Sequence, residues 1–284
     1  MSVITISNTQ ISVQIKSFGA ELCSMKSNSN REYIWGGNPA FWGKHSPILF
    51  PIVGTLKNNT FYHNDTEYTL SRHGFARDME FELVQKTDNS ATFSIHSNAE
   101  TIKNYPFQFE LQIQYTLNNS SLELTYTVIN KNNSVLPFSI GAHPAFALSA
   151  NFENYSLAFE KVEPYEYSLL ENDLVSKQTK KINTVSNTIP LTYSLFERDA
   201  LIFKNLKSNA LTILENEIPI LKVHFKDFPN LGIWTKVGAP FICIEPWFGY
   251  SDTNESTGNL FEKEGVIALK TGGTFQTKFC IEIL

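Results

Sequence analysis

Hydrophobic and polar residues alternate with a period of two along most of the chain. Ile11, Val13 and Ile15 alternate with polar residues, and the same alternation runs from Phe107 to Tyr115. Successive side chains of a strand point to opposite faces, so this period is typical of strands with one buried face. By the same criteria, further strands are expected over residues 66–70, 80–85, 91–96, 122–128, 155–160, 209–215, 219–225, 231–235, 241–245 and 274–283.

Short polar turns rich in Asn, Asp, Gly and Ser separate these segments. The sequence NNSS at 118–121 lies between two alternating segments and predicts a hairpin. Helical periodicity is nearly absent, and we expect only short helical turns over 38–43 and 103–106. Many short strands at close spacing favour antiparallel sheets in a sandwich or barrel over βαβ units, so the chain is expected to be all-β.

The polar segment 171–190 is the one candidate boundary within the chain. It could be a long surface excursion, or it could divide two halves, but strand-like sequence flanks it on both sides. The sequence has no linker, low-complexity tract or repeat of fixed period. We therefore expect a single domain over residues 1–284.

Composition and charge narrow the classes of partner. With 42% hydrophobic and 18% charged residues, the 284-residue chain can bury a large core and is not disordered overall. A net charge of -5 argues against a nucleic-acid surface, which needs a basic stripe. No signal peptide and no apolar run of about 20 residues is evident, which predicts a soluble cytoplasmic protein without a membrane partner. The three cysteines lie far apart and form neither a disulfide framework nor a zinc motif.

Two of the six histidines have unusual surroundings. His143 lies in SIGAHPAFAL, among small and apolar residues, and His73 lies in SRHGFARD beside charged Arg77. A histidine in such apolar sequence is either a catalytic group or a core histidine bonded to the backbone. Both interpretations stay open on these residues alone.

Two acids stand out because they interrupt apolar strands. Glu245 in FICIEPWFGY ends a strand that is apolar on both faces, and Asp199 precedes the apolar run ALIF. Burial of a carboxylate is costly and raises its pKa, so Glu245 suggests a base at the rim of an aromatic pocket. The alternative is a structural carboxylate bonded to a tryptophan or to a backbone N–H.

These residue types suit proton transfer without a cofactor. A carboxylate base and an imidazole acid can move protons at two oxygens of a bound sugar. No HxH, HxxxH or HExxH spacing supports a metal site, and no GxSxG elbow supports a nucleophilic triad. We therefore expect neither metal nor cofactor. The four tryptophans, at positions 35, 42, 234 and 247, could offer a platform for sugar stacking.

Three motifs in order, HGFAR at His73, GAHPAF at His143 and IEPW at Glu245, resemble the aldose 1-epimerase (galactose mutarotase) family. The similarity spans the chain and is greatest to the shorter LacX-type branch, which shares a PILFPIVG-like segment. The resemblance implies a large antiparallel β-supersandwich. It also implies a hexose of galactose or glucose type as substrate, in a monomer or homodimer.

The resemblance further implies a role for each site residue. Glu245 would be the base that takes the proton of the C1 hydroxyl, and His143 the acid that protonates the ring oxygen. His73 and Asp199 would bind the sugar. Arg77 and Trp247 are expected to contribute to substrate binding.

One position departs from the family pattern. The family usually carries an arginine where this chain has Thr55, and Arg77 or Lys57 could supply the missing cation. A hexose 6-phosphate is an alternative substrate, if folding gathers basic residues such as Arg72, Arg77, Lys44 and Lys57. A non-catalytic sugar-binding or regulatory protein is a further alternative. We also expect His143 and Glu245 to face one pocket from opposite sides, a few ångströms beyond direct contact.

Overall fold

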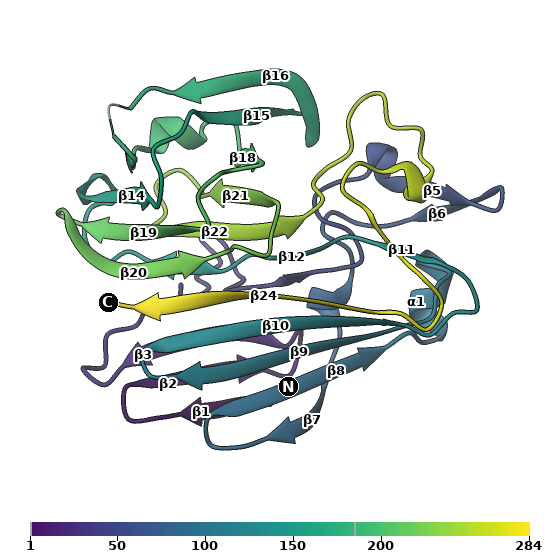
Figure 1. Cartoon of the computed structure of the whole chain (residues 1–284), viewed down its shortest axis with the longest axis horizontal. Helices are drawn as coiled ribbons and strands as arrows, with labels where there is room; N and C mark the ends of the chain where they lie inside the picture. The colour runs from purple at the N-terminus through teal and green to yellow at the C-terminus, as the bar shows by residue number, and fades with distance from the viewer. Residues whose placement is uncertain (1, 185) are drawn as a thin grey trace.

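Two large antiparallel sheets make up most of the fold, as the alternating sequence predicted. The structure is a computed structural model and describes residues 2–184 and 186–284. One sheet has nine strands, and Figure 1 shows β24, β10, β9 and β8 of it side by side. In order across that sheet the strands are β17 (Thr188–Pro190), β14 (Tyr155–Phe159), β19 (Ala210–Glu215), β20 (Ile218–His224), β24 (Thr274–Ile283), β10 (Ser121–Asn130), β9 (Phe109–Asn118), β8 (Ser90–His96) and β7 (Glu82–Lys86).

The second large sheet has eight strands and carries most of the residues of interest. Its outer strands β15 and β16 lie at the upper edge of Figure 1. Strand β22 pairs with β21, β12 and β13, so it lies inside the sheet. The strands are β16 (Leu174–Ile182), β15 (Tyr165–Glu171), β18 (Leu201–Lys204), β21 (Asn230–Trp234), β22 (Phe241–Phe248), β12 (Ile140–Ala142), β4 (Ile48–Leu49) and, beside β22, β13 (Ala145–Ala147).

Smaller elements complete the fold. One three-stranded sheet consists of β1 (Val3–Ser7), β2 (Ile11–Lys16) and β3 (Glu21–Ser27). One two-stranded sheet pairs β5 (Thr60–His63) with β6 (Thr66–Thr69), and another pairs β11 (Leu136–Phe138) with β23 (Ile267–Leu269). The helical segments are α1 (Ala99–Asn104) and the 3-10 turns η1 (Lys57–Asn59), η2 (Ala76–Asp78), η3 (Phe152–Asn154), η4 (Tyr193–Phe196) and η5 (Leu260–Glu262). Within the described residues, α1 is too short to cross a membrane, and so is every other helix.

A continuous apolar core connects the sheets. One cluster of buried side chains runs from Ile6 to Ile281 and includes Ile242 and Ile244 of β22. The opposite face of β22 is buried too, because Phe241 and Cys243 pack in a second cluster with Trp35. This confirms the sequence interpretation that the strand before Glu245 is apolar on both faces. The single-domain arrangement stays a prediction, which the continuous core supports.

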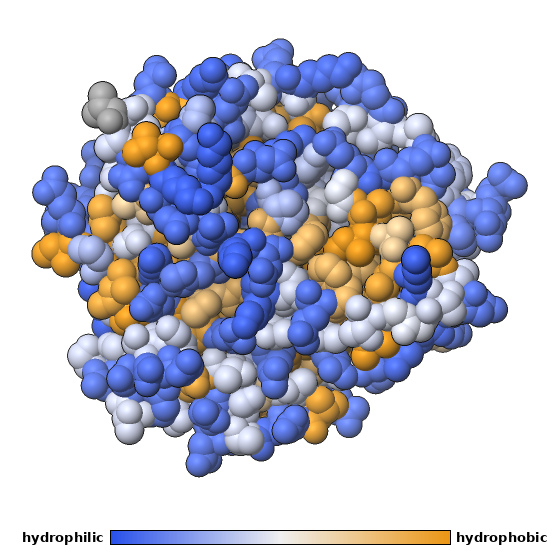
Figure 2. Space-filling model, viewed as in Figure 1, coloured by the Kyte–Doolittle hydropathy of each residue, from blue (hydrophilic) through white to orange (hydrophobic). Residues whose placement is uncertain are grey.

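The surface mixes polar and apolar side chains. Figure 2 shows hydrophilic side chains over most of one face, with apolar residues gathered in small areas between them. Exposed apolar side chains such as Val162 and Ile218 are normal for a folded protein, since polar atoms do not cover the whole surface.

The helix expected over 103–106 was placed too late in the chain. Helix α1 covers Ala99–Asn104, and its first turn is fixed by a capping box in which the Asn98 side chain accepts from the backbone of Thr101. Pro106 lies beyond its end. The single turn expected over 38–43 is present, since the Asn38 carbonyl accepts hydrogen bonds from the N–H groups of Phe41 and Trp42.

Candidate active site

His143 and Glu245 lie opposite each other on neighbouring strands. Gly141 of β12 pairs with Trp247 of β22, and Ala145 of β13 pairs with Cys243 of the same strand. This register places His143, in the short gap between β12 and β13, opposite Glu245. Side chains of directly opposed strand residues are near neighbours, so the backbone itself brings the two groups together.

The two groups are in direct contact, with Nε2 of His143 3.2 Å from Oε2 of Glu245. The expectation that they lie beyond contact on opposite sides of a pocket was therefore wrong. The physical reason is the strand register, because the pairing of β12 and β13 with β22 on either side of His143 brings its side chain against that of Glu245. The contact is not aligned as a hydrogen bond, so among the described residues Oε2 has no donor.

Burial changes the protonation of both groups. Desolvation raises the pKa of Glu245 well above its usual range, while Arg72 opposes this change and Asp199 adds to it. Desolvation, opposed by the neighbouring backbone and aided by the charges of Arg72 and Arg77, lowers the pKa of His143 to about 3. Burial thus disfavours both the carboxylate and the imidazolium, so a single titratable proton on the ligand-free pair would be favoured on Glu245, beside a neutral ring.

Aromatic rings enclose the imidazole of His143. Trp42 stacks on it with ring centroids 4.8 Å apart, and Trp234 meets it edge-on at 5.8 Å. The ring of His73 is also edge-on, at 5.7 Å. Nδ1 of His143 is buried and has no partner in the described part of the chain. The ring is therefore held by packing rather than by a hydrogen bond.

His73 enters the same site from a tight turn. Its backbone has a positive φ of 68°, and Gly74 follows with a φ of 70°. At Gly74 a side chain would meet the carbonyl oxygen of Phe50 at 2.3 Å, so only glycine fits there. This turn holds the buried imidazole of His73 at the cavity.

Asp199 and Arg77 reach the site from two other segments. Asp199 precedes β18 with a φ of 75°, and its Oδ1 accepts a hydrogen bond from the Ala200 backbone at 2.8 Å. Arg77 lies in η2, and its Nη2 donates to the carbonyl of Arg72 at 2.7 Å. Burial lowers the pKa of Arg77.

These side chains surround one cavity of about 630 Å³. The cavity brings together all six site residues predicted from the sequence, which are His73, Arg77, His143, Asp199, Glu245 and Trp247. Sequence reasoning had proposed all four tryptophans as a possible platform. Trp42, Trp234 and Trp247 line the cavity, whereas Trp35 does not. The lining residues are Trp42, Arg72, His73, Arg77, His143, Phe196, Asp199, Ala200, Trp234, Thr235, Lys236, Val237, Glu245 and Trp247.

Two glycines make room for the ring of Trp247. A side chain at Gly232 would meet the far edge of the indole at 2.5 Å, and one at Gly141 would meet its near edge at 2.6 Å. These glycines occupy β21 and β12, the two strands beside β22. The indole Nε1 makes no aligned hydrogen bond among the described residues, but its N–H is near enough to Glu245 to oppose the rise in the pKa of that carboxyl.

Thr55 is buried away from the cavity. Its backbone N–H donates to Ser251 Oγ at 2.9 Å, and its carbonyl accepts from Asp252. Lys57 donates to the carbonyl of Asn254 and does not line the cavity either. The cations at the cavity are Arg72, Arg77 and Lys236. Arg77 was expected there from the sequence, Arg72 had been named only as part of a hypothetical phosphate cluster, and nothing in the sequence indicated Lys236.

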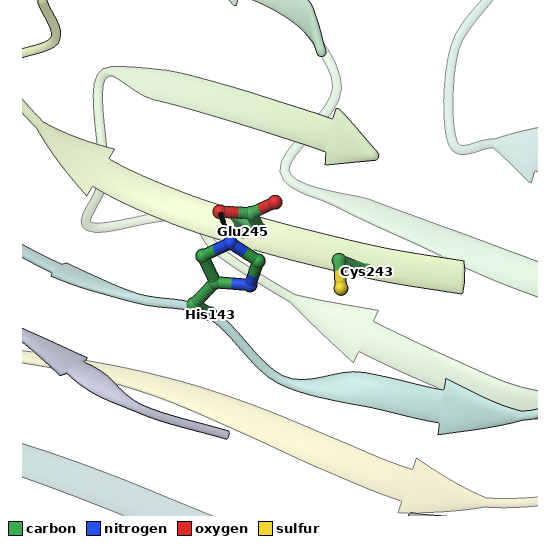
Figure 3. A group of neighbouring side chains, drawn as sticks. All are labelled: His143, Cys243 and Glu245. Atoms are coloured by element: carbon green, nitrogen blue, oxygen red, sulfur yellow. Dashed lines mark ion pairs between the residues drawn. The ribbon is translucent and has the colours of Figure 1, made fainter. Parts of the chain in front are cut away.

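Cys243 adds a sulfur atom next to His143 and Glu245. Figure 3 shows Cys243 two positions before Glu245 on β22, with the imidazole of His143 in front of the strand. One donor atom from each of the three residues lies within 4.8 Å of the others. Burial raises the pKa of the Cys243 thiol well above its usual range, with Glu245 adding to the effect, which disfavours the thiolate that binds metals. The absence of a required metal stays a prediction.

The two large antiparallel sheets are those of a galactose mutarotase-like fold. Residues 2–267 match the family described as aldose 1-epimerase. The chain belongs to this family, which confirms the resemblance drawn from the three motifs.

Relatives support the same assignment along the whole chain. The chain is 37% identical over 296 residues to the plasmid-encoded protein LacX of Lactococcus lactis subsp. lactis, covering 99% of each chain. A galactose mutarotase related enzyme from Lactobacillus acidophilus superposes with a TM-score of 0.95 at 35% identity, covering 100% of this chain and 97% of the other. A galactose mutarotase-like protein from Lactobacillus casei superposes with a TM-score of 0.93 at 32% identity, with 100% of both chains covered. Family and fold together support a mutarotase function.

Proposed function

We propose that the chain is an aldose 1-epimerase that interconverts the α and β anomers of a hexose without a cofactor. The observation that carries this proposal is the contact between His143 and Glu245 at the floor of a cavity lined by sugar-binding side-chain types. Trp247 offers an indole N–H and Asp199 a carboxylate for sugar hydroxyls, while His73 and Arg77 add hydrogen-bonding groups.

Ring opening needs His143 in its protonated form and Glu245 as a carboxylate. Glu245 as carboxylate takes the proton of the C1 hydroxyl, the bond between C1 and the ring oxygen breaks, and His143 protonates that oxygen. The C1–C2 bond then rotates. In closure His143 takes the proton back as the ring oxygen attacks the other face of C1, and Glu245 returns its proton to the C1 oxygen.

Burial favours the state with the proton on Glu245, which is the state that the closing half of this cycle uses. Nε2 of His143 lies 3.2 Å from Oε2 of Glu245, so a small reorientation that aligns the two groups would let the proton pass to His143 before ring opening. Over one complete turnover the pair gains and loses no proton, so the buried site needs no exchange with solvent.

Polarimetry of freshly dissolved α-galactose and α-glucose tests the proposal. We expect the purified protein to accelerate the approach to the anomeric equilibrium over buffer alone, and to do so equally in the presence of a chelator. If neither sugar nor its 6-phosphate is accelerated, the mutarotase proposal fails and a sugar-binding role takes its place. Loss of activity on chelation would contradict the cofactor-free mechanism.

A hexose 6-phosphate is a second candidate substrate because three cations line the cavity, Arg72, Arg77 and Lys236. The folded chain gathers only two of the four basic residues considered from the sequence. Lys44 instead pairs with Asp78 at 2.8 Å, and Lys57 bonds the carbonyl of Asn254. A kcat/KM at least tenfold higher for glucose 6-phosphate than for glucose would favour the phosphorylated substrate.

The pH profile should have an unusual acid side. A second proton on the pair removes the base, and this happens only as the pH falls through the pKa of His143, which burial lowers to about 3. We therefore expect kcat/KM, corrected for the buffer reaction, to stay constant from pH 7 down to about pH 5. A loss of activity centred near the ordinary histidine pKa of about 6.5 would contradict this assignment.

A further inference from the structure

Arg72 lies in the cavity wall next to His73, and neighbouring segments hold it at both ends. Its Nη1 is 3.0 Å from Asp173 in the turn between β15 and β16, and its Nη2 is 3.4 Å from Asp199. Arg77 donates to its backbone carbonyl. The side chain is nevertheless 37% exposed, and it lines the cavity.

The backbone fixes which ring nitrogen of His73 carries hydrogen. The N–H of Gly54 donates to Nδ1 of His73 at 3.1 Å, and the N–H of His73 donates to the Gly54 carbonyl at 2.8 Å. A backbone N–H can only donate, so Nδ1 must be the bare nitrogen. Desolvation, followed by the charges of His143 and the two arginines, lowers the pKa of His73 well below its usual range, so the ring is neutral. A neutral imidazole carries one hydrogen, which we assign to Nε2.

This assignment leaves two donors facing each other. Nε of Arg72 is 3.3 Å from Nε2 of His73, and an arginine Nε always carries hydrogen. Two N–H groups cannot bond each other, so the contact is unsatisfied in the ligand-free site. An oxygen placed beside both groups would accept both hydrogens, because hydroxyl and ether oxygens have two lone pairs.

We propose that Arg72 is a sugar-binding residue, and that its Nε–H and the Nε2–H of His73 form a two-donor site for one sugar oxygen. This inference rests on the proposed function, since it takes the ligand of the cavity to be a sugar. It assigns to Arg72 the cation that Thr55 does not supply. It also gives the salt bridges with Asp173 and Asp199 a role, because they hold the guanidinium in position for the shared oxygen.

The tautomer of His73 is the first test and needs no activity. In a long-range ¹H–¹⁵N spectrum of labelled protein, with the His73 signals assigned from the His73→Gln variant, we expect a protonated Nε2 and a bare Nδ1. A protonated Nδ1 would overturn the proposal, because Arg72 would then simply donate to Nε2 within the protein.

Sugar affinity is the second test. Arg72→Lys keeps a positive charge near Asp173 and Asp199 but removes the Nε–H. We expect the Kd for galactose and glucose, measured by calorimetry, to rise about tenfold, which is the effect of losing one charged hydrogen bond. Arg31→Lys is the matched control, since Arg31 pairs with Glu215 at 2.6 Å outside the cavity, and it should leave the Kd unchanged. An unchanged Kd in Arg72→Lys refutes the two-donor site.

A double-mutant cycle separates this role from a structural one. If Arg72 and His73 share one oxygen, the second substitution should cost little once the first has been made. The Kd of the double variant Arg72→Lys/His73→Gln should then be close to the larger of the two single-variant Kd values. Fully additive losses would contradict a shared oxygen. These binding results do not depend on turnover. Weaker binding in Arg72→Lys with an inactive wild type would therefore refute the mutarotase proposal and leave the sugar site standing.

Discussion

Glu245→Gln should lower kcat/KM for mutarotation by about 10²–10⁴-fold, because an amide can neither take the C1 hydroxyl proton nor return it. The variant should still fold. Glu245 is 1% exposed and its Oε2 has no donor in the described part of the chain, so a neutral side chain of the same shape suits the site at least as well. Polarimetry and the thermal midpoint, measured on the same preparation, check both expectations.

The chain offers a matched control for this variant. Glu282 forms a second contact between a carboxylate and a histidine, with Oε2 2.9 Å from Nε2 of His224, on β24 and β20 outside the cavity. Glu282→Gln should therefore leave the rate unchanged. If Glu245→Gln kept the full rate, the base would have to be another group, even though the activity itself would stand.

Gly232→Ala should lower kcat/KM by about 10²-fold while the fold is kept, since misplacement of a site group by about 1 Å can cost this much. The added carbon would meet the Trp247 ring at 2.5 Å, so the indole must move. Gly232 pairs with Glu245 across the sheet, which means that the displaced ring disturbs the acid–base pair directly. Steady-state polarimetry measures the loss, and tryptophan fluorescence reports the altered ring.

Gly36→Ala is the control for this prediction. A side chain at Gly36 meets no atom within 4 Å, so the substitution should change neither rate nor fluorescence. A Gly232→Ala variant with the wild-type rate would show that the position of Trp247 is unimportant for turnover. Trp247 would then have to be removed from the proposed binding residues.

Strands with one buried face were predictable from the sequence because burial imposes the period of two. The strand expected over 274–283 has these bounds in β24, and the hairpin at 118–121 joins β9 to β10. Strand β16 was missed because seven of its nine residues are exposed or half-buried. An edge strand of this kind shows no alternation, and the polar segment 171–190 was therefore interpreted as an excursion or a boundary.

The site was predictable as a set of residues but not as a geometry. The three motifs identified His73, His143 and Glu245, whereas the register of β22 with β12 and β13 decided that His143 and Glu245 touch. Arg72 was underestimated for a similar reason. Its partner Asp173 is about one hundred residues away in sequence, and only the fold brings the turn after β15 to the cavity.

The position of β24 has a consequence for how the protein is made. This strand lies between β20 and β10, and in the nine-stranded sheet it alone joins the β17–β14–β19–β20 group to the β10–β9–β8–β7 group. On the ribosome both groups are synthesised before residue 274 emerges, so each exposes an open strand edge. Open edges pair readily with other chains, so the growing chain is most prone to aggregation just before its central strand arrives.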